Sequence, residues 1–528
     1  DWMQSEGSFT GTKEFASFSY SPKTWLISQN FSYLSTVQTN IKTSFFRYQS
    51  KNEKYLGKIK AGVSAEAEKN IWKAKTNDSL LLSSFSFYKW NGYFGNIDTA
   101  NAWWLVKYGE RNDFAPLLNQ LKQTYKSKES SIEGHLPFQK HFQGTITLTY
   151  RQLQSYYDTI KPKDNNLTSR TDLYFRFAKN AISFNTTHES NAGLEQKLSY
   201  TYLEVPAGQG VYTWIDYNAN GIKELNEFEI AQFQDQATYI RVTSSTLDYV
   251  KVYGSRLSQT INLRPELVWG NKKRLKKLLA ALSDQFAFQQ DIKTQSADLV
   301  NRLLPIYVND SQQLTMNHLI RNTFSINKTN NTWGIDYILQ KSNNAQLLLN
   351  GIDRRTMQNH TITLRINPNQ TLTFFVSPTL GEKTYLSEFF SNKNYDIKNK
   401  AIELNLQYQN NQDFRISPYV KYNQKQNRVA NDEATMQTFG IEMRKNIKSD
   451  NYFSLKIDIV KNSYNGTLYS SIYYEMLEGL QPGWNQVYTL QVQRNISSTL
   501  QMVISYQGRA SENSKMIHSG NIEMRAWF

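Results

Sequence analysis

The feature that most constrains the fold is a period-two alternation of apolar and polar residues, which recurs along most of the 528 residues. In one segment Ile402, Leu404 and Leu406 alternate with polar residues, and in another Ile362 and Leu364 do so. Successive side chains of a β-strand point to opposite faces, so this period predicts strands with one apolar and one polar face. The segments run to about ten to fourteen residues, the length that a tilted strand needs to cross a bilayer.

Two all-β architectures share this alternation: a soluble sandwich or propeller, and a transmembrane barrel with a wall one residue thick. Only 39% of the residues are hydrophobic, while aromatic residues reach 14%, with 33 Tyr and 28 Phe. A large soluble core needs Leu, Ile and Val at high density, whereas a barrel wall needs apolar side chains only toward lipid. No stretch reaches the roughly 18 apolar residues of a membrane-spanning helix, which excludes an α-helical membrane protein.

The C-terminal residues decide between these two architectures. Phe528, Ala526 and Met524 fall on one face of a last alternating segment. A terminal strand that ends on an aromatic residue is typical of outer-membrane barrels, whereas the ends of soluble chains usually fray. We therefore predict an all-β, antiparallel, transmembrane β-barrel, integral to the bacterial outer membrane, whose last strand closes the wall against an N-terminal strand. At about 24 residues for each strand with its loop, we expect about 20–22 strands.

The barrel is predicted to be a single domain over residues 1–528. Two long departures from the alternation, near residues 97–134 and 270–315, are predicted to be long loops. In the first of them, residues 116–121 are predicted to form a short helix. The chain opens at Asp1 without an initiator Met or a signal peptide. We therefore expect it to be the later part of a longer protein.

An insertion at residues 208–237 contains the sharpest motif of the sequence. Residues 216–227 fit the calcium-loop pattern D-x-[DN]-x-[DN]-G-x5-E at every fixed position. Ca²⁺ takes six to eight oxygens, and a loop can supply them from alternate side chains, a backbone carbonyl and a closing bidentate glutamate. The candidate ligands are the side chains of Asp216, Asn218, Asn220, Glu224 and Glu227 and the carbonyl of Ile222. We predict a structural calcium ion between two strands; the alternative is an Asn/Gly-rich turn without an ion.

The net charge of +15 raises the question of an acidic partner. Most basic residues are scattered over the strands, which argues against nucleic acid. One cluster lies directly before an apolar run at 278–282, and it consists of Lys272, Lys273, Arg274, Lys276 and Lys277. This cluster is either a solvated loop or short helix, or a belt that contacts lipopolysaccharide phosphates or an acidic partner.

The sequence shows no convincing set of catalytic residues, and we predict that the protein is not an enzyme. The chain has no cysteine, which removes thiolate catalysis, Cys-ligated metals and disulfides. Glu133, His135 and His141 are close enough in sequence to form a metal site, but two His six residues apart are more often incidental. Residues 208–210 continue into a predicted strand, so this Gly-x-Gly is not a phosphate-binding loop.

Several stretches taken together resemble a family of large, poorly characterised outer-membrane β-barrel proteins of Bacteroidota. They are residues 208–218, 224–229 and 235–237, residues 349–351 with Arg354 and Arg355, residues 474–483, residues 505–509, residues 518–520 and residues 525–528. The resemblance covers about residues 200–528, the C-terminal barrel region of such proteins. It implies a long extracytoplasmic region before the barrel in family members, and it supplies no assigned activity.

Two functions are open for such a barrel. The first is a structural or conduit subunit of an envelope complex that exports or assembles surface and outer-membrane proteins, with other envelope proteins as partners. The second is a stand-alone porin or receptor-type channel for small solutes, because a wall of about 20 strands encloses a lumen that must be plugged or conduct. The charges that could line a constriction are Lys58, Lys60, Arg151, Arg365, Lys456 and Arg525. We favour the complex, in part because an aromatic-rich loop around Trp103 and Trp104 suits a protein interface.

Overall fold

The computed structural model describes residues 2–5, 9–96, 102–139, 141–156, 163–270, 273–298, 313–348, 351–388, 390–411, 413–447, 451–512 and 514–527. The chain divides into two compact units, and each is described by itself. The first unit is Asp1–Arg176, Phe184–Gly193 and Tyr253–Arg256; the second is Phe177–Ser183, Leu194–Val252 and Leu257–Phe528.

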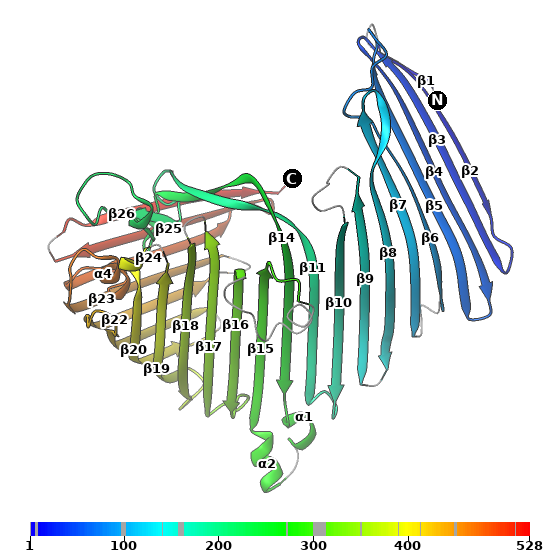
Figure 1. Cartoon of the computed structure of the whole chain (residues 1–528). Helices are drawn as coiled ribbons and strands as arrows, with labels where there is room; N and C mark the ends of the chain where they lie inside the picture. Colours follow the sequence, from blue (N-terminus) through cyan, green and yellow to red (C-terminus); the bar gives the residue numbers. More distant parts are fainter. Residues whose placement is uncertain are drawn as a thin grey trace. The chain divides into compact units, whose positions relative to one another are not determined.

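The first unit is an antiparallel meander in which neighbours in the chain are neighbours in the sheet (Figure 1). From β1 to β10, consecutive strands pair antiparallel, β1 with β2 and so on to β9 with β10. The strands are β1 (Trp2–Ser5), β2 (Phe9–Tyr20), β3 (Trp25–Gln38), β4 (Ile41–Leu56), β5 (Ile59–Ala74), β6 (Phe85–Asn96), β7 (Trp103–Leu117), β8 (Gln120–Gln139), β9 (Phe142–Ser155) and β10 (Lys163–Phe177). Two long strands, β11 (Ile182–Glu204) and β14 (Tyr239–Leu263), contribute residues to both units.

The second unit continues the same pattern: from β15 to β26, consecutive strands pair antiparallel, β15 with β16 and so on to β25 with β26. We call these the wall strands. They are β15 (Leu282–Thr294), β16 (Gln313–Ile326), β17 (Trp333–Leu348), β18 (Gly351–Ile366), β19 (Leu372–Ser387), β20 (Tyr395–Gln409), β21 (Phe414–Asn427), β22 (Glu433–Asn446), β23 (Tyr452–Asn465), β24 (Gly483–Asn495), β25 (Leu500–Ser511) and β26 (Ile517–Ala526). The short elements are β12 (Tyr212–Trp214), η1 (Leu225–Glu227), β13 (Phe228–Ile230), η2 (Gln234–Gln236), α1 (Glu266–Trp269), α2 (Leu275–Ala280), η4 (Ser391–Lys393) and α4 (Ser471–Met476).

The described residues thus form 26 strands, of which all but β1, β12 and β13 are ten residues or longer. The 23 long strands slightly exceed the expected number of about 20–22, because many hairpin turns are shorter than assumed. Closure of the wall by its first and last strands stays a prediction, and Phe528 lies outside the described residues.

The predicted long loop near residues 97–134 is wrong for the residues that the structure describes there. Residues 103–134 belong to β7 and β8, which join through a two-residue turn with left-handed backbone at Leu118 (φ 49°) and Asn119 (φ 64°). Two consecutive positive φ values are typical of the tight hairpin turn that matches strand twist, and Asn tolerates this conformation well. Pro116, which we predicted to start a short helix, lies in β7 opposite Leu121.

The second predicted loop, near residues 270–315, is only partly a loop. Residues 282–294 form β15, and α2 precedes them at 275–280. Residues 299–312 lie outside the described residues. Within the described part of the chain, no helix is long and apolar enough to cross a membrane.

Side-chain burial in the wall strands is inverted relative to a soluble protein. On β21, Asn423, Lys425 and Asn427 are buried, whereas Val420 and Tyr422 on the opposite face are exposed. Burial of polar side chains together with exposure of apolar ones is unfavourable in water, because apolar surface is most stable away from it. It is the arrangement expected of a wall that faces lipid.

The exposed apolar residues line up across neighbouring strands. Leu404, Val420, Phe439 and Ile459 lie side by side in register on β20 to β23, and each is at least 41% exposed. A contiguous apolar band of this kind is rare on soluble monomers. The sheet is therefore a transmembrane wall, as the alternation in the sequence predicts.

Aromatic side chains add to this lipid-facing surface in the first unit. Trp90 and Tyr108 contact each other with ring centroids 5.8 Å apart, and Phe94 and Trp104 do so at 5.5 Å. All four rings are exposed on β6 and β7. Trp103 and Trp104 were predicted to lie in a partner-binding loop, but they begin β7; Trp104 belongs to this exposed aromatic surface, whereas Trp103 lies on the opposite face, with its ring 5.9 Å from that of His135.

Candidate functional site

The main departure from a plain wall is a structure that we call the cap. It consists of the insert, residues 205–238 between β11 and β14, and the α4 loop, residues 466–482 between β23 and β24. The insert contains the hairpin of β12 and β13, in which Tyr212 pairs with Ile230 and Trp214 with Phe228. The insertion predicted at 208–237 lies within this segment. Both parts of the cap belong to the second unit, so their contacts with the wall strands are defined.

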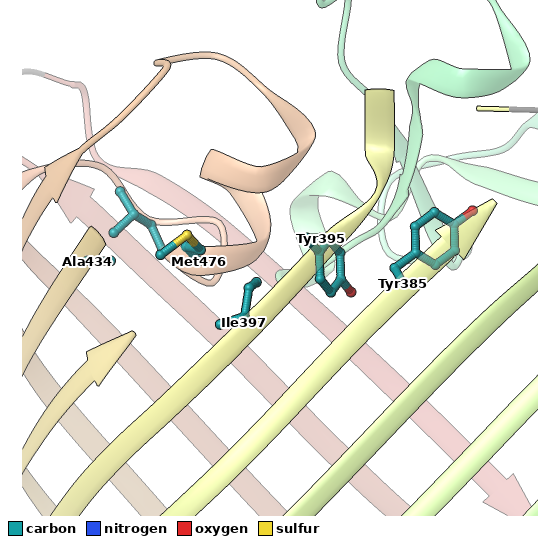
Figure 2. Close-up of a cluster of buried hydrophobic side chains, with 6 residues drawn as sticks. Tyr385, Tyr395, Ile397, Ala434 and Met476 are labelled. Atoms are coloured by element: carbon teal, nitrogen blue, oxygen red, sulfur yellow. The ribbon is translucent and has the colours of Figure 1, made fainter. Parts of the chain in front are cut away.

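The α4 loop is held to the wall by apolar burial. Helix α4 begins after Ser470, whose hydroxyl caps it by accepting a hydrogen bond from the Tyr473 N–H (3.1 Å). At its end Met476 and Leu477 are fully buried against side chains of β19, β20 and β22 (Figure 2). These wall side chains are Tyr385, Tyr395, Ile397 and Ala434. Burial of two large apolar side chains contributes roughly 3–6 kcal/mol to the docking of this loop.

The insert is held to the wall by ion pairs. Lys393, in η4, contacts Glu229 at 2.7 Å, and the two side chains are only 8% and 10% exposed. Arg509, on β25, contacts Asp235 at 2.7 Å, with exposures of 14% and 19%. Lys393 also donates to the carbonyl of Phe228 (3.1 Å). Burial raises the pKa of Glu229, and the nearby Lys393 ammonium opposes this effect.

The two parts of the cap also bind each other. The Tyr474 hydroxyl of the α4 loop accepts a hydrogen bond from the Gln232 N–H (3.0 Å) and forms another with the Gln236 side chain (2.8 Å). The α4 loop has its own ion pairs with the wall, Lys425–Glu478 at 2.6 Å and a contact between Lys383 and Glu475. Tyr474 thus joins two parts of the cap that lie more than 200 residues apart in the chain, while Glu475 and Glu478 join the α4 loop to the wall.

The cap brings together most of the stretches that carry the family resemblance. Residues 208–218 and 224–237 form the insert, residues 474–483 form the end of the α4 loop, and Arg509 anchors Asp235. Arg355, from another of these stretches, lies under the cap, with its guanidinium 4.9 Å from the Tyr385 ring. The motifs therefore describe one three-dimensional site, although the sequence shows them only as separate pieces.

A pocket of about 440 Å³ lies between the insert and the strands beneath it. Aromatic and polar side chains line it together, and Tyr202 and Phe228 stack there with centroids 3.9 Å apart. Two guanidinium groups, of Arg241 and Arg355, also line it. Among the described residues, neither has a carboxylate within ion-pair distance. The remaining charged lining residues are Lys293, Lys393, Asp291 and Asp353. Sequence analysis flagged Arg355 only as part of the resemblance and missed the pocket.

The predicted calcium ligands all lie on one turn of the insert. The Asp216 carboxylate accepts hydrogen bonds from the N–H groups of Asn220 (3.2 Å) and Gly221 (2.8 Å). The Asn220 side chain accepts one from the Ile222 N–H (2.6 Å), and the Asn218 amide donates to Glu224 (2.8 Å). Glu227 closes the turn as a fully buried residue of η1. No three His, Cys, Asp or Glu side chains of the described residues form a metal-holding group, so amide and carbonyl oxygens would have to complete the set.

The basic cluster lies at helix α2. Lys273, Arg274, Lys276 and Lys277 are exposed there, and Lys272 lies outside the described residues. Leu275 and Leu278 on the same short helix are 70% and 68% exposed. Exposed cations beside exposed leucines suit the boundary between lipid and headgroup phosphates. Contact with lipopolysaccharide or an acidic partner stays a prediction.

The other candidate residues are engaged locally. Glu133 pairs with Lys107 (2.6 Å), His135 lies 3.3 Å from the Thr145 hydroxyl, and His141 contacts the Arg176 carbonyl (3.0 Å).

The charges proposed for a constriction also have near neighbours of their own. Lys60 pairs with Glu53, Lys456 with Asp458 and Arg525 with Glu523, while Arg365 donates to carbonyls of the 328–330 turn. Arg151 lies opposite Glu129 in register, and Lys58 lies in the turn between β4 and β5.

No family model matches the chain, and no curated protein matches it in sequence. Among solved structures, the ferric enterobactin receptor PfeA of Pseudomonas aeruginosa is similar with a TM-score of 0.34 at 8% identity, over 96% of this chain and 75% of that one. The FrpB iron transporter of Neisseria meningitidis gives a TM-score of 0.33 at 8% identity, over 92% and 77%. The RagAB peptide transporter gives 0.29 at 8% identity, over 95% and 72%. Likeness at this level assigns no ligand, partner or mechanism to this chain.

The wall of the chain itself gives its class and location. Its long strands are antiparallel, with an exposed apolar face and a polar face opposite. In a bilayer every backbone polar group must be paired, and antiparallel barrels of the outer membrane satisfy this requirement with strands. The chain is an integral outer-membrane protein of the β-barrel class.

Proposed function

We propose that the protein is a structural or conduit subunit of an envelope complex that exports or assembles surface and outer-membrane proteins. The observation that supports this function best is the cap. It covers part of the polar face of the wall strands, since Lys425, which lies opposite the exposed apolar row on β21, is buried there and donates to the Met476 carbonyl of the α4 loop (2.9 Å). A free diffusion pore needs an open polar face, whereas a subunit that works with partners does not.

The anchoring of the cap supports a fixed element rather than a lid that opens readily. Ion pairs whose members are less than a fifth exposed join it to η4 and β25. Removal of one partner of such a pair leaves an uncompensated buried charge, at a cost of about 3–5 kcal/mol. A cap that had to open in each transport cycle would have to break several such contacts.

Purification from gently solubilised native membranes tests the proposal. We expect a stable hetero-complex with other envelope proteins, identified by native gel and mass spectrometry, and little conductance of the isolated protein in a planar bilayer. The double variant Lys393→Met/Arg509→Met, which loosens the cap, should conduct more than the wild type. A lone monomer or homotrimer with clear single-channel conductance would overturn the proposal.

A second function, a receptor-type channel for small solutes, is favoured by the pocket under the insert. Its aromatic rings can stack on sugar or ring faces, and the guanidinium groups of Arg241 and Arg355 can bind a carboxylate. Calorimetry with uronic-acid oligosaccharides and their neutral counterparts separates this function from the first. Binding of the acidic ligands alone, lost in Arg355→Gln, would favour the receptor; equal or absent binding of both would exclude it.

A further inference from the structure

We propose that residues 216–227 of the insert bind one calcium ion, which fixes the insert against the wall. This inference does not depend on the proposed function, because a conduit subunit and a receptor could both use such an ion. It concerns the same cap, but its experiment measures metal binding directly.

The carboxylate of Glu227 provides the structural argument. Glu227 is 0% exposed. Its Oε2 accepts hydrogen bonds from the Trp214 indole N–H (2.8 Å) and the Glu224 backbone N–H (3.3 Å). Its Oε1 is buried without a hydrogen-bond partner among the described residues. A buried carboxylate oxygen without a hydrogen-bond partner is strongly unfavourable, and a bound cation would compensate its charge.

No side chain of the described residues supplies that cation. Lys223, the one basic residue of the loop, contacts Glu204 outside it at 2.7 Å. Glu227 has no Lys, Arg or His within ion-pair distance in the described part of the chain. The carboxylate is therefore fully buried inside a loop whose own lysine is paired elsewhere.

The loop around Glu227 has the composition of a calcium site. Asp216, Asn218 and Asn220 place side-chain oxygens on alternate residues, and Gly221 takes the left-handed backbone (φ 71°) that its tight bend requires. With the carbonyl of Ile222 and both oxygens of Glu227, the loop can supply six oxygens. Six or more oxygens, several of them from neutral amides and carbonyls, suit Ca²⁺ rather than Mg²⁺, which keeps most of its water.

An ion at this position would act directly on the cap. Glu227 is followed in sequence by Phe228 and Glu229, whose carbonyl and carboxylate both bind Lys393. Tyr217, inside the loop, donates from its hydroxyl to Glu229 (3.3 Å). Fixing the loop around an ion therefore fixes the groups that anchor the insert.

Terbium luminescence tests the site in the full chain in detergent. Tb³⁺ replaces Ca²⁺ in oxygen sites, and Trp214 touches Glu227, so excitation of the indole should sensitise a bound Tb³⁺. We expect a Tb³⁺ signal that Ca²⁺ displaces, with a Ca²⁺ dissociation constant on the order of 10⁻⁴–10⁻³ M, because the loop holds few carboxylates. Chelation with EGTA should also increase hydrogen exchange of residues 212–230.

Three variants make the result specific. Glu227→Gln keeps an acceptor for Trp214 and removes the charge, and Asp216→Asn removes the first ligand charge; each should weaken Ca²⁺ binding at least tenfold. The control Glu382→Gln removes an exposed carboxylate of β19 that is not a ligand, and its Ca²⁺ affinity should stay within twofold. If Glu227→Gln fails to fold, the Ca²⁺ affinity of Asp216→Asn still tests the proposal. A wild type without displaceable Tb³⁺ signal at roughly 10 mM Ca²⁺, or ligand variants that bind as tightly as the control, would overturn the proposal.

Discussion

Lys393→Met should release the insert from the wall. The docking free energy lost in this variant can be estimated from the buried Lys393–Glu229 pair. In the wild type the Glu229 carboxylate receives the Lys393 ammonium at 2.7 Å and the Tyr217 hydroxyl at 3.3 Å. The substitution removes the positive charge and keeps an apolar chain of similar length. A buried carboxylate left without its cation costs about 3–5 kcal/mol if it stays ionised.

Protonation sets an upper limit on this cost. To protonate a carboxyl whose ordinary pKa is 4.5 at pH 7 costs about 3.4 kcal/mol. We therefore expect a loss of about 3 kcal/mol at pH 7, which increases the population of the open insert by roughly a hundredfold or more. Burial already raises the pKa of Glu229, and the loss of Lys393 raises it further. A carboxyl group whose pKa is raised in the docked state stabilises that state below its ordinary pKa, and this stabilisation is lost as the pH rises. The docking free energy lost in Lys393→Met should therefore become smaller as the pH falls toward 4.5.

Hydrogen exchange measured by mass spectrometry on residues 212–230, corrected for intrinsic rates, follows the opening of the insert. The control Lys398→Met removes a cation of the exposed Lys398–Glu382 pair (4.0 Å) and should change nothing measurable. Adding Glu229→Gln to Lys393→Met should recover much of the protection, because no charge is then buried. Exchange equal to wild type at pH 7, or a defect of equal size at both pH values, would refute this account of the anchor.

Three other substitutions test separate parts of the structure. Met476→Ala should cost about 2–5 kcal/mol, because the side chain is fully buried, and should expose the α4 loop to limited proteolysis; an unchanged cleavage rate would contradict the docking described here. Tyr474→Phe should cost about 1–3 kcal/mol, because it leaves the Gln232 N–H without its acceptor, and should loosen the insert in the same exchange assay. Leu404→Arg should destabilise the protein folded in liposomes by about 2–4 kcal/mol, while Glu403→Arg on the opposite face should be nearly neutral; equal effects would mean that the exposed row does not face lipid.

The wall could be predicted from the sequence because it depends on local information. The alternation of Ile402, Leu404 and Leu406 with polar residues recurs as β20, with its apolar side exposed. The hairpin at Leu118–Asn119 was missed because residues 116–121 read as helix in isolation, while their backbone follows from pairing between β7 and β8. Tertiary pairing overrides local preference at such a position.

The cap could not be predicted, for a different reason. Each of its decisive contacts joins residues far apart in the chain, such as Gln232 with Tyr474 and Asp235 with Arg509. A single sequence marks such residues as polar and gives no partner for them. The candidate calcium loop could be proposed from the sequence because its candidate ligands lie within twelve residues, a span that a motif can describe.

The long-range contacts of the cap also set an order on biogenesis. The insert is synthesised before β15, but its anchors Lys393, Tyr474 and Arg509 are made far later in the chain. Residues 205–238 therefore lack part of their docking surface until the last wall strands have been made. A chain that stalls before β25 is inserted lacks Arg509, so Asp235 of this segment is left without its partner. Complete docking of the insert thus requires that the C-terminal strands are in place.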